Sequence, residues 1–175
     1  MVGKILIVIR VSECIYMLHN RYNESVQEYN NRVCRFVDKL LRDSVVAKDI
    51  TQETYLRLWE KRSSVDFDKV RAWLFTTAYR LSMDHLNKQK RFDRSDQMPE
   101  RWIEQENTDL KKIVNDSLAL LTDQQRSIVL LKDYEGYSYQ EIGQILSLSD
   151  SQVKVYLFRA RQIIKNYIGD LRLVL

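Results

Sequence analysis

The chain has 175 residues, of which 45% are hydrophobic and 30% charged, with one Pro and four Gly. This length suits one ordinary domain or two small ones, and so few turn-forming residues argue against a fold of many short strands. An all-α fold is therefore expected. The net charge of +4 fits a nucleic-acid partner without establishing one.

We expect residues 1–19 to be an N-terminal extension. Its apolar stretch, KILIVIRV at residues 4–11, is too short to span a bilayer, which takes about 20 apolar residues. It also lacks the small-residue cleavage site of a signal peptide. Met17 is an alternative start, which would leave residues 1–16 outside the native protein. We expect a cytoplasmic protein without membrane insertion.

The cysteines and histidines do not form a motif. Cys14 and Cys34 are twenty residues apart, with no second pair and no histidine cluster at metal-binding spacing. We expect a cytosolic protein in which both cysteines are reduced thiols. We expect no metal site, no cofactor and no catalytic residues.

A first helical domain is expected at residues 20–91. Within it, residues 44–62 read as a helix whose buried stripe is Val46, Ile50, Thr54 and Leu58. A second face gathers acids around one apolar residue, because side chains three and four apart are neighbours on a helix. Such a face repels DNA and suits a basic protein partner; its members are Asp49, Gln52, Glu53, Leu56 and Glu60.

The next helix, from about Lys69 to Arg91, is basic toward its C-terminal half. Residues 70–91 carry five bases and one acid, and aromatic residues interleave with the bases. Aromatic rings beside cations suit unstacked bases, although Trp73 is expected in the core. The preceding loop SSVDFD, at residues 63–68 with Phe67, could shape a pocket for an extruded base.

A linker is expected at residues 92–108. Residues 95–110 carry five acids and one base, contain the only proline, Pro99, and have few apolar residues. We expect this linker to leave the two domains loosely joined.

The second domain, residues 109–170 before a tail at 171–175, has clear helix starts. Thr122 with Gln125, Ser138 with Glu141 and Ser149 with Gln152 each fit a capping box. They predict helices near 123–133, 139–146 and 150–168, after a first helix near 109–120.

The last two predicted helices have the pattern of a helix-turn-helix. The residues expected to face inward are Ile142, Leu146, Leu148, Val153 and Leu157, and Gly143 permits a close helix crossing. Ser147 stands where the turn often has glycine, so it must adopt a less favourable conformation or the turn must differ. The outward face carries Lys154, Arg159, Arg161 and Lys165, which suits phosphate and base contacts.

Four consecutive parts of the chain together resemble a bacterial sigma factor of the extracytoplasmic-function class. They are AKDITQETYLRLWE, VRAWLFTTAYRLSMDHLNKQKR, the acidic linker, and LLTDQQRSIVLLKDYEGYSYQEIGQILSLSDSQVKVYLFRAR. The resemblance covers residues 20–168 in the family's order. It implies a two-domain, all-helical subunit that binds core RNA polymerase and promoter DNA and is not itself an enzyme. An anti-sigma factor is a further candidate partner.

The resemblance also assigns roles to residues of this chain. Contact with the β′ coiled coil of polymerase would involve Asp49, Gln52, Glu53 and Leu56. Melting and reading the −10 element would involve Phe67, Arg80, Asp84, Asn87, Lys88 and Arg91. Reading the −35 element would involve Ser151, Gln152, Lys154, Val155, Phe158, Arg159 and Arg161.

The chain departs from the family pattern at Arg80, where Asn is common, and at Val155 and Tyr156, so the promoter sequence does not carry over. Two other classes stay open. A stand-alone dimeric helix-turn-helix regulator would explain residues 138–165 but not the acidic face. A small hydrolase or nuclease would need a cluster of catalytic residues, and the sequence contains only the isolated pair Asp84 and His85 as a candidate.

Overall fold

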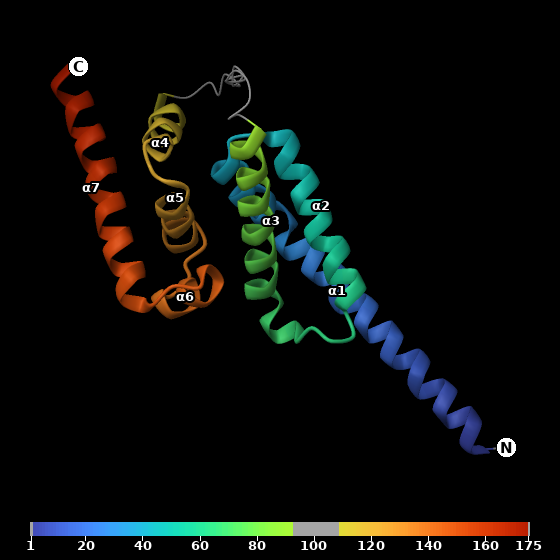
Figure 1. Cartoon of the computed structure of the whole chain (residues 1–175). Helices are drawn as coiled ribbons and strands as arrows, with labels where there is room; N and C mark the ends of the chain where they lie inside the picture. The colour runs from blue at the N-terminus through green and yellow to red at the C-terminus, as the bar shows by residue number, and fades with distance from the viewer. Residues whose placement is uncertain (1, 93–108, 175) are drawn as a thin grey trace.

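The computed structural model describes residues 2–92 and 109–174 and, within them, the side chains of residues 16–91 and 112–169. All regular structure in these ranges is helical (Figure 1), which confirms the expected all-α fold. Apart from Phe92, the predicted linker lies outside the described residues. The elements are α1 (Val2–Leu41), α2 (Ser44–Lys61), the 3₁₀ turn η1 (Phe67–Lys69), α3 (Val70–Phe92), α4 (Asp109–Ala119), α5 (Asp123–Val129), the π-helical turn η2 (Leu130–Tyr134), α6 (Tyr139–Leu146) and α7 (Asp150–Val174).

The first three helices pack against one another around an apolar core. On α2 the predicted stripe is buried at Ile50, Thr54 and Leu58 and half-buried at Val46. The Thr54 hydroxyl donates to the Ile50 carbonyl at 2.7 Å, so this polar side chain is satisfied within its own helix. Burying each large aliphatic side chain contributes about 1.5–3 kcal/mol.

All three predicted capping boxes form. The Thr122, Ser138 and Ser149 hydroxyls accept from the amide three residues later, at 3.2–3.3 Å. In return the Gln125, Glu141 and Gln152 side chains accept from the cap residues' own amides. Each box satisfies two of the amides that a helix start leaves without partners, which is why these three starts could be predicted locally.

The turn between α6 and α7 depends on close backbone packing. A Cβ at Gly143 would lie 2.6 Å from the Leu148 carbonyl oxygen, and the Leu148 amide donates to the Gly143 carbonyl at 2.8 Å. Ser147 takes the left-handed conformation, with φ of 58°, which is the first of the two alternatives that the sequence left open. Four of the five residues expected to face inward are buried, and Leu148 is half-buried.

The helix predicted at residues 123–133 changes type partway. It is α-helical to Val129 and then makes one π-turn, with the Glu135 amide donating to the Leu130 carbonyl at 3.1 Å. Apolar periodicity does not distinguish an α-turn from a single π-turn, so the sequence pattern missed this change. Gly136, with φ of +73°, then turns the chain toward Tyr137.

The expectation of loosely joined domains is wrong, because the two halves pack together. Tyr137 is 1% exposed; its ring lies 5.5 Å from Phe75 and 4.1 Å from the Arg71 guanidinium. The Glu135 carboxylate pairs with Arg32 at 2.7 Å, and Arg71 donates to the Glu135 carbonyl. These contacts join α1 and α3 to the segment between η2 and α6 (Figure 1).

Replacement of Gly143 by Ala should lower the free energy of unfolding by about 1–3 kcal/mol, because the new methyl meets backbone that must move. Urea unfolding followed by circular dichroism measures the change. Gly169→Ala is the matched control, since a Cβ at that helical position would meet no described atom within 4 Å other than its chain neighbours and the backbone of its own helix. The control should be neutral or stabilising by up to about 1 kcal/mol. Equal stability of both variants would contradict the close crossing.

Candidate functional site

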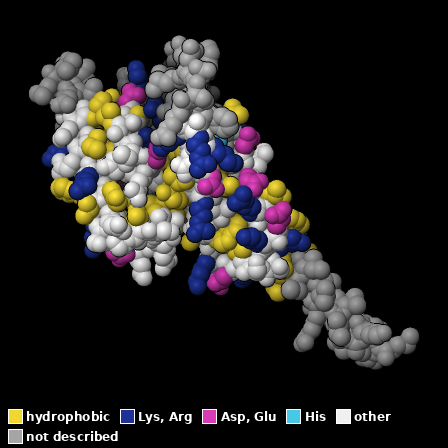
Figure 2. Space-filling model, viewed as in Figure 1, with side chains coloured by type: hydrophobic (Ala, Val, Ile, Leu, Met, Phe, Trp, Pro, Cys, Tyr) yellow, Lys and Arg dark blue, Asp and Glu magenta, His cyan; other side chains and the backbone are white. Residues whose placement is uncertain are grey.

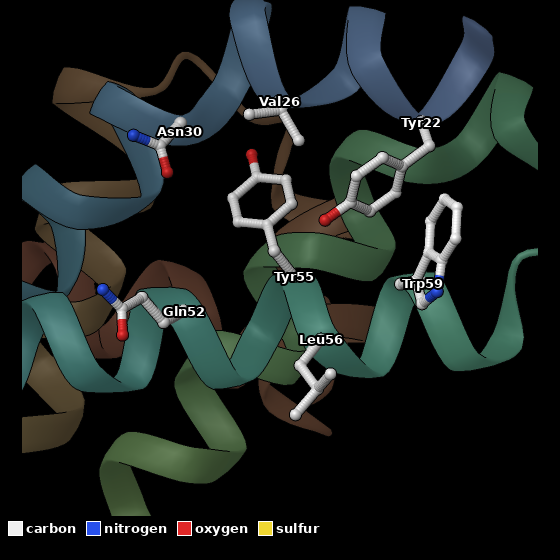
Figure 3. A pocket seen from close by; sticks show the side chains of 7 residues that line it. All are labelled: Tyr22, Val26, Asn30, Gln52, Tyr55, Leu56 and Trp59. Atoms are coloured by element: carbon white, nitrogen blue, oxygen red, sulfur yellow. The ribbon is translucent and has the colours of Figure 1, made fainter. Parts of the chain in front are cut away.

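A groove runs between α1 and α2 on the first half of the molecule. Figure 3 shows its lining, which comes from both helices: Tyr22, Val26 and Asn30 of α1, and Gln52, Tyr55, Leu56 and Trp59 of α2. Leu56 is 51% exposed although it is a large aliphatic residue. The groove therefore offers apolar surface to a partner.

Aromatic packing holds the walls of this groove in place. The Trp59 ring lies 5.0 Å from Tyr22 in an edge-to-face arrangement, and the Arg62 guanidinium lies 4.0 Å above it. The Tyr55 hydroxyl donates to the Ser25 carbonyl at 3.2 Å, and burial raises the pKa of Tyr55. A surface fixed by rings and a buried hydrogen bond loses little entropy when a partner binds.

Of the polar residues of α2 expected to contact polymerase, Gln52 lines the groove, and Asp49 and Glu53 lie outside its lining. Asp49 and Gln52 are exposed, as predicted for a docking face. Glu53 is half-buried and its carboxylate accepts from Arg57 at 2.8 Å, so part of its charge is compensated within the helix. In Figure 2 acidic and basic side chains are mixed on this part of the molecule. We call Asp49, Gln52, Glu53 and Leu56 the α2 face.

A second surface lies along the C-terminal half of α3. Its five residues are all exposed, and they recur at intervals that place them on one side of the helix. We call this set the α3 face: Arg80, Asp84, Asn87, Lys88 and Arg91. Three cations and two side chains that can hydrogen-bond with bases are thus presented together.

Phe67 does not join the α3 face. It lies in η1, half-buried against the core, thirteen residues before Arg80. At 1.5 Å per residue that spacing is about 20 Å along the helix axis. The loop before α3 is held by a contact of its own, because Asp66 caps η1 by accepting from the Asp68 amide at 3.0 Å.

A third surface is the exposed side of α7, opposite the buried residues Val153, Leu157 and Ala160. We call the following exposed residues the α7 face: Ser151, Gln152, Lys154, Val155, Phe158 and Arg159. The Lys154 ammonium lies 5.7 Å from the centre of the Tyr139 ring, so this side chain extends from the first turns of α7 toward the start of α6. Ser149 and Gln152 fix that end of α7 by their capping box.

Arg161, predicted in the same set, is exposed but already paired. Its guanidinium donates to the Asp133 carboxylate at 2.6 Å, and this hydrogen bond raises the pKa of Arg161. At the start of α6, hydrogen bonds from Ser138 lower the pKa of the Glu141 carboxyl. The first contact joins α7 to η2, and the second caps the start of α6.

The contribution of α1 to the groove was not predicted from the sequence. The signal was present, since Tyr22, Val26, Tyr29 and Val33 recur at helical spacing. That pattern alone describes a buried stripe. Only the packing of α2 shows that Tyr22 and Val26 line an open groove at the edge of that stripe.

Among the described residues, no group of three or more His, Cys, Asp or Glu side chains could hold a metal ion. Within the same residues, no helix combines the length and the apolarity that a membrane span requires.

Two family models match this chain in consecutive segments. Residues 25–92 match Sigma-70 region 2, and residues 111–164 match Sigma-70 region 4. The first segment contains the α2 and α3 faces, and the second contains the α7 face.

Similarity to known proteins covers most of the length of the chain. It is 30% identical over 155 residues to the ECF RNA polymerase sigma factor SigM of Bacillus subtilis, covering 82% of this chain and 92% of that protein. It is 28% identical to the ECF RNA polymerase sigma factor SigE of Mycolicibacterium smegmatis, covering 85% of this chain and 62% of that protein. Its fold is similar to the sigma factor RpoE of Bartonella quintana, solved in complex with the anti-sigma factor NepR, with a TM-score of 0.76, 21% identity, and coverage of 85% and 96%.

Proposed function

Because the chain belongs to the extracytoplasmic-function family of RNA polymerase sigma factors, which direct promoter-specific transcription, we propose specific roles for its three exposed faces. The α2 face and its groove bind core RNA polymerase. The α3 face melts and reads the −10 element, and the α7 face reads the −35 element. The observation that carries this proposal is that all three faces are exposed on one chain matching both sigma regions.

Docking through α2 is supported by the combination of chemistry at the groove. Leu56 and Trp59 offer apolar surface, and Asp49 and Glu53 offer negative charge beside it. Apolar anchors at the centre of an interface supply affinity, while charges at its rim guide a partner of opposite charge. A basic helical element, such as the β′ coiled coil of polymerase, fits this surface.

DNA binding by the α3 and α7 faces is supported by their exposed cations. Lys88 and Arg80 extend from one helix, and Lys154 and Arg159 extend from another. Phosphate contacts position a protein on DNA, and side chains near the start of a recognition helix contact base edges. A stand-alone dimeric regulator is not favoured, because it has no use for the segment that matches region 2.

In this proposal the protein catalyses no reaction itself. Polymerase supplies the chemistry, and this subunit selects the start site in the cytoplasm. An anti-sigma factor is proposed as a further partner, because the structurally similar RpoE was solved with one.

Run-off transcription tests the proposed function as a whole. Core polymerase would be supplied with DNA from upstream of the operon that encodes this chain, with and without the protein. A transcript of defined length is expected only when the protein is present. Transcription that is the same in both reactions would overturn the proposal.

Reversing the acids of the α2 face should abolish binding to core polymerase. The double variant Asp49→Lys and Glu53→Lys places two cations where a basic partner would approach, while both side chains lie outside the core. Co-purification with core polymerase measures the loss. The control is Glu24→Lys with Glu28→Lys, two exposed acids on the side of α1 turned away from the groove. Equal binding by both folded double variants would rule out this docking surface.

The α3 and α7 faces should fail at different steps of initiation. Alanine at both Lys154 and Arg159 should weaken promoter recruitment about 5- to 150-fold, the range of a lost base contact. Alanine at both Arg80 and Lys88 should impair DNA opening instead, and a template with a pre-melted bubble should restore part of the activity. Filter binding reports recruitment, and permanganate footprinting reports unpaired thymines.

The controls for this comparison are the templates themselves. A template lacking the upstream element should remove the difference between the Lys154/Arg159 variant and the parent. If both double variants lose the same activity on every template, the division between the two faces is wrong.

A further inference from the structure

One small cluster of side chains joins the two halves of the chain. The Glu135 carboxylate pairs with Arg32 at 2.7 Å and lies 3.9 Å from the Arg71 guanidinium. The same guanidinium lies 4.1 Å from the centre of the Tyr137 ring, and the Phe75 ring lies 5.5 Å from that ring. We call these five residues the interdomain interface. It links α1 and α3 of the first half to the segment that leads into α6 and α7.

Two polar atoms of this interface are buried and have no hydrogen-bond partner among the described residues. They are the Tyr137 hydroxyl oxygen and the Arg71 Nε. A buried polar atom that forms no hydrogen bond has lost its contact with water without compensation. Water reaches both atoms again when the halves separate. The interface is therefore favourable through its ion pair and its rings, and unfavourable at these two atoms.

Other contacts between the halves can be exchanged for water at low cost. Lys90 pairs with Asp123 at 3.0 Å, and the Lys90 side chain is 66% exposed, so this ion pair contributes little. The Arg126 guanidinium donates to the Leu40 carbonyl of α1, but its other two carbonyl acceptors belong to its own half. Separation of the halves thus removes one of its three hydrogen bonds to carbonyls and leaves two.

The closed arrangement brings the α3 and α7 faces too near each other for a promoter. Helix α6 packs against α3 and α7 packs against α6, so both faces belong to one packed body (Figure 1). A compact body of about 160 residues has a radius of gyration of about 15 Å and is about 40 Å across. Elements at −10 and −35 are about 25 base pairs apart, which is about 85 Å along the duplex at about 3.4 Å per pair. The closed chain therefore cannot bind both elements at once.

We infer that the interdomain interface is an autoinhibitory contact, which holds the free chain closed and must separate before the α3 and α7 faces bind one promoter together. Its inhibitory effect rests on the proposed function, whereas closure is a property of the free chain. The groove beside the α2 face contains no residue of the interface, so core polymerase can bind the closed chain first. Closure then lowers the apparent affinity for promoter DNA in proportion to the fraction of open chains.

Two fluorescent probes measure closure in the full chain without polymerase or DNA. Lys48→Cys in α2 and Gln162→Cys in α7 would carry the probes, because both positions are exposed and lie outside the interface. Cys14→Ser and Cys34→Ser would remove the chain's own thiols. Energy transfer in the parent should report one short distance. The distance should lengthen when core polymerase and promoter DNA are both added.

Variants of the interface should shift closure in opposite directions. Glu135→Gln removes the charge that pairs with Arg32 and should favour opening about 10- to 100-fold, the range for a hydrogen bond to a charged group. Tyr137→Phe removes a buried hydroxyl that has no partner and should favour closure about fivefold or more. Asp133→Asn is the matched control. It weakens an ion pair of similar length, to Arg161, that lies within the second half, so the distance should not change.

Promoter binding should follow the same order as opening. In filter binding with core polymerase, Glu135→Gln should reach half-maximal promoter occupancy at a lower protein concentration than the parent, by up to the factor that the probes report. Tyr137→Phe should require a higher concentration than the parent. Circular dichroism would verify that each variant is folded.

Three results would overturn the inference. One is a parent chain whose probes report the same distance before and after polymerase and promoter are added. Another is a folded Glu135→Gln variant that is no more open than Asp133→Asn. The third is a Glu135→Gln variant that opens but binds the promoter no better than the parent. Failure of the proposed function looks different, since the probes would still respond to Glu135→Gln while no variant would support transcription.

Discussion

The carbonyl groups at the C-terminal ends of α1 and α4 converge on one buried guanidinium. Arg126, 7% exposed, donates to the carbonyls of Leu40, Leu118 and Leu121 at 2.8, 2.8 and 2.9 Å. The last carbonyls of a helix lack hydrogen-bond partners within it and carry partial negative charge. A cation there is therefore favoured both as a hydrogen-bond donor and by charge attraction. The Asp123 carboxylate lies 3.6 Å from the same guanidinium and compensates part of its charge. The ends of α1 and α4 are therefore held beside α5.

This constraint determines where the exposed faces lie. With α5 held against α1, the segment from Glu135 to Tyr137 reaches Arg32, Arg71 and Phe75 of the first half. Helix α6 then lies against α3, and α7 packs against α5, α6 and α4 on the side away from α3 (Figure 1). The result is one packed arrangement in which the α3 and α7 faces both remain exposed.

Local features of the fold were predictable from the sequence, and distant contacts were not. The capping boxes at Thr122, Ser138 and Ser149 each involve residues three apart, so local chemistry was sufficient to place three helix starts. The close approach at Gly143 also follows from a neighbouring turn. Helical spacing was sufficient to predict the exposed side of α2 and the exposed cations of α3 and α7. The remaining members of the α7 face, and the assignment of Phe67 to the −10 element, came from the family resemblance.

The contacts between the two halves lacked any such local signal. Arg32 and Glu135 are 103 residues apart, and neither belongs to a recognisable motif. Composition therefore suggested two independent domains joined by an acidic linker, whereas the ion pair and the buried Tyr137 ring join them. The groove was missed for a related reason, since Tyr22 and Leu56 become neighbours only when α1 and α2 pack.

The turn between α6 and α7 has a consequence for the substitutions that the protein tolerates. At position 143 every side chain other than hydrogen meets a backbone carbonyl. The constraint is therefore steric, and no residue other than glycine fits without a shift of the backbone. At Ser147 the cost is only conformational, about 1–2 kcal/mol for a left-handed residue with a Cβ. Serine also restricts the unfolded chain more than glycine would, which offsets part of that cost. Position 147 can therefore drift among residue types over evolutionary time, while position 143, four residues earlier in α6, cannot.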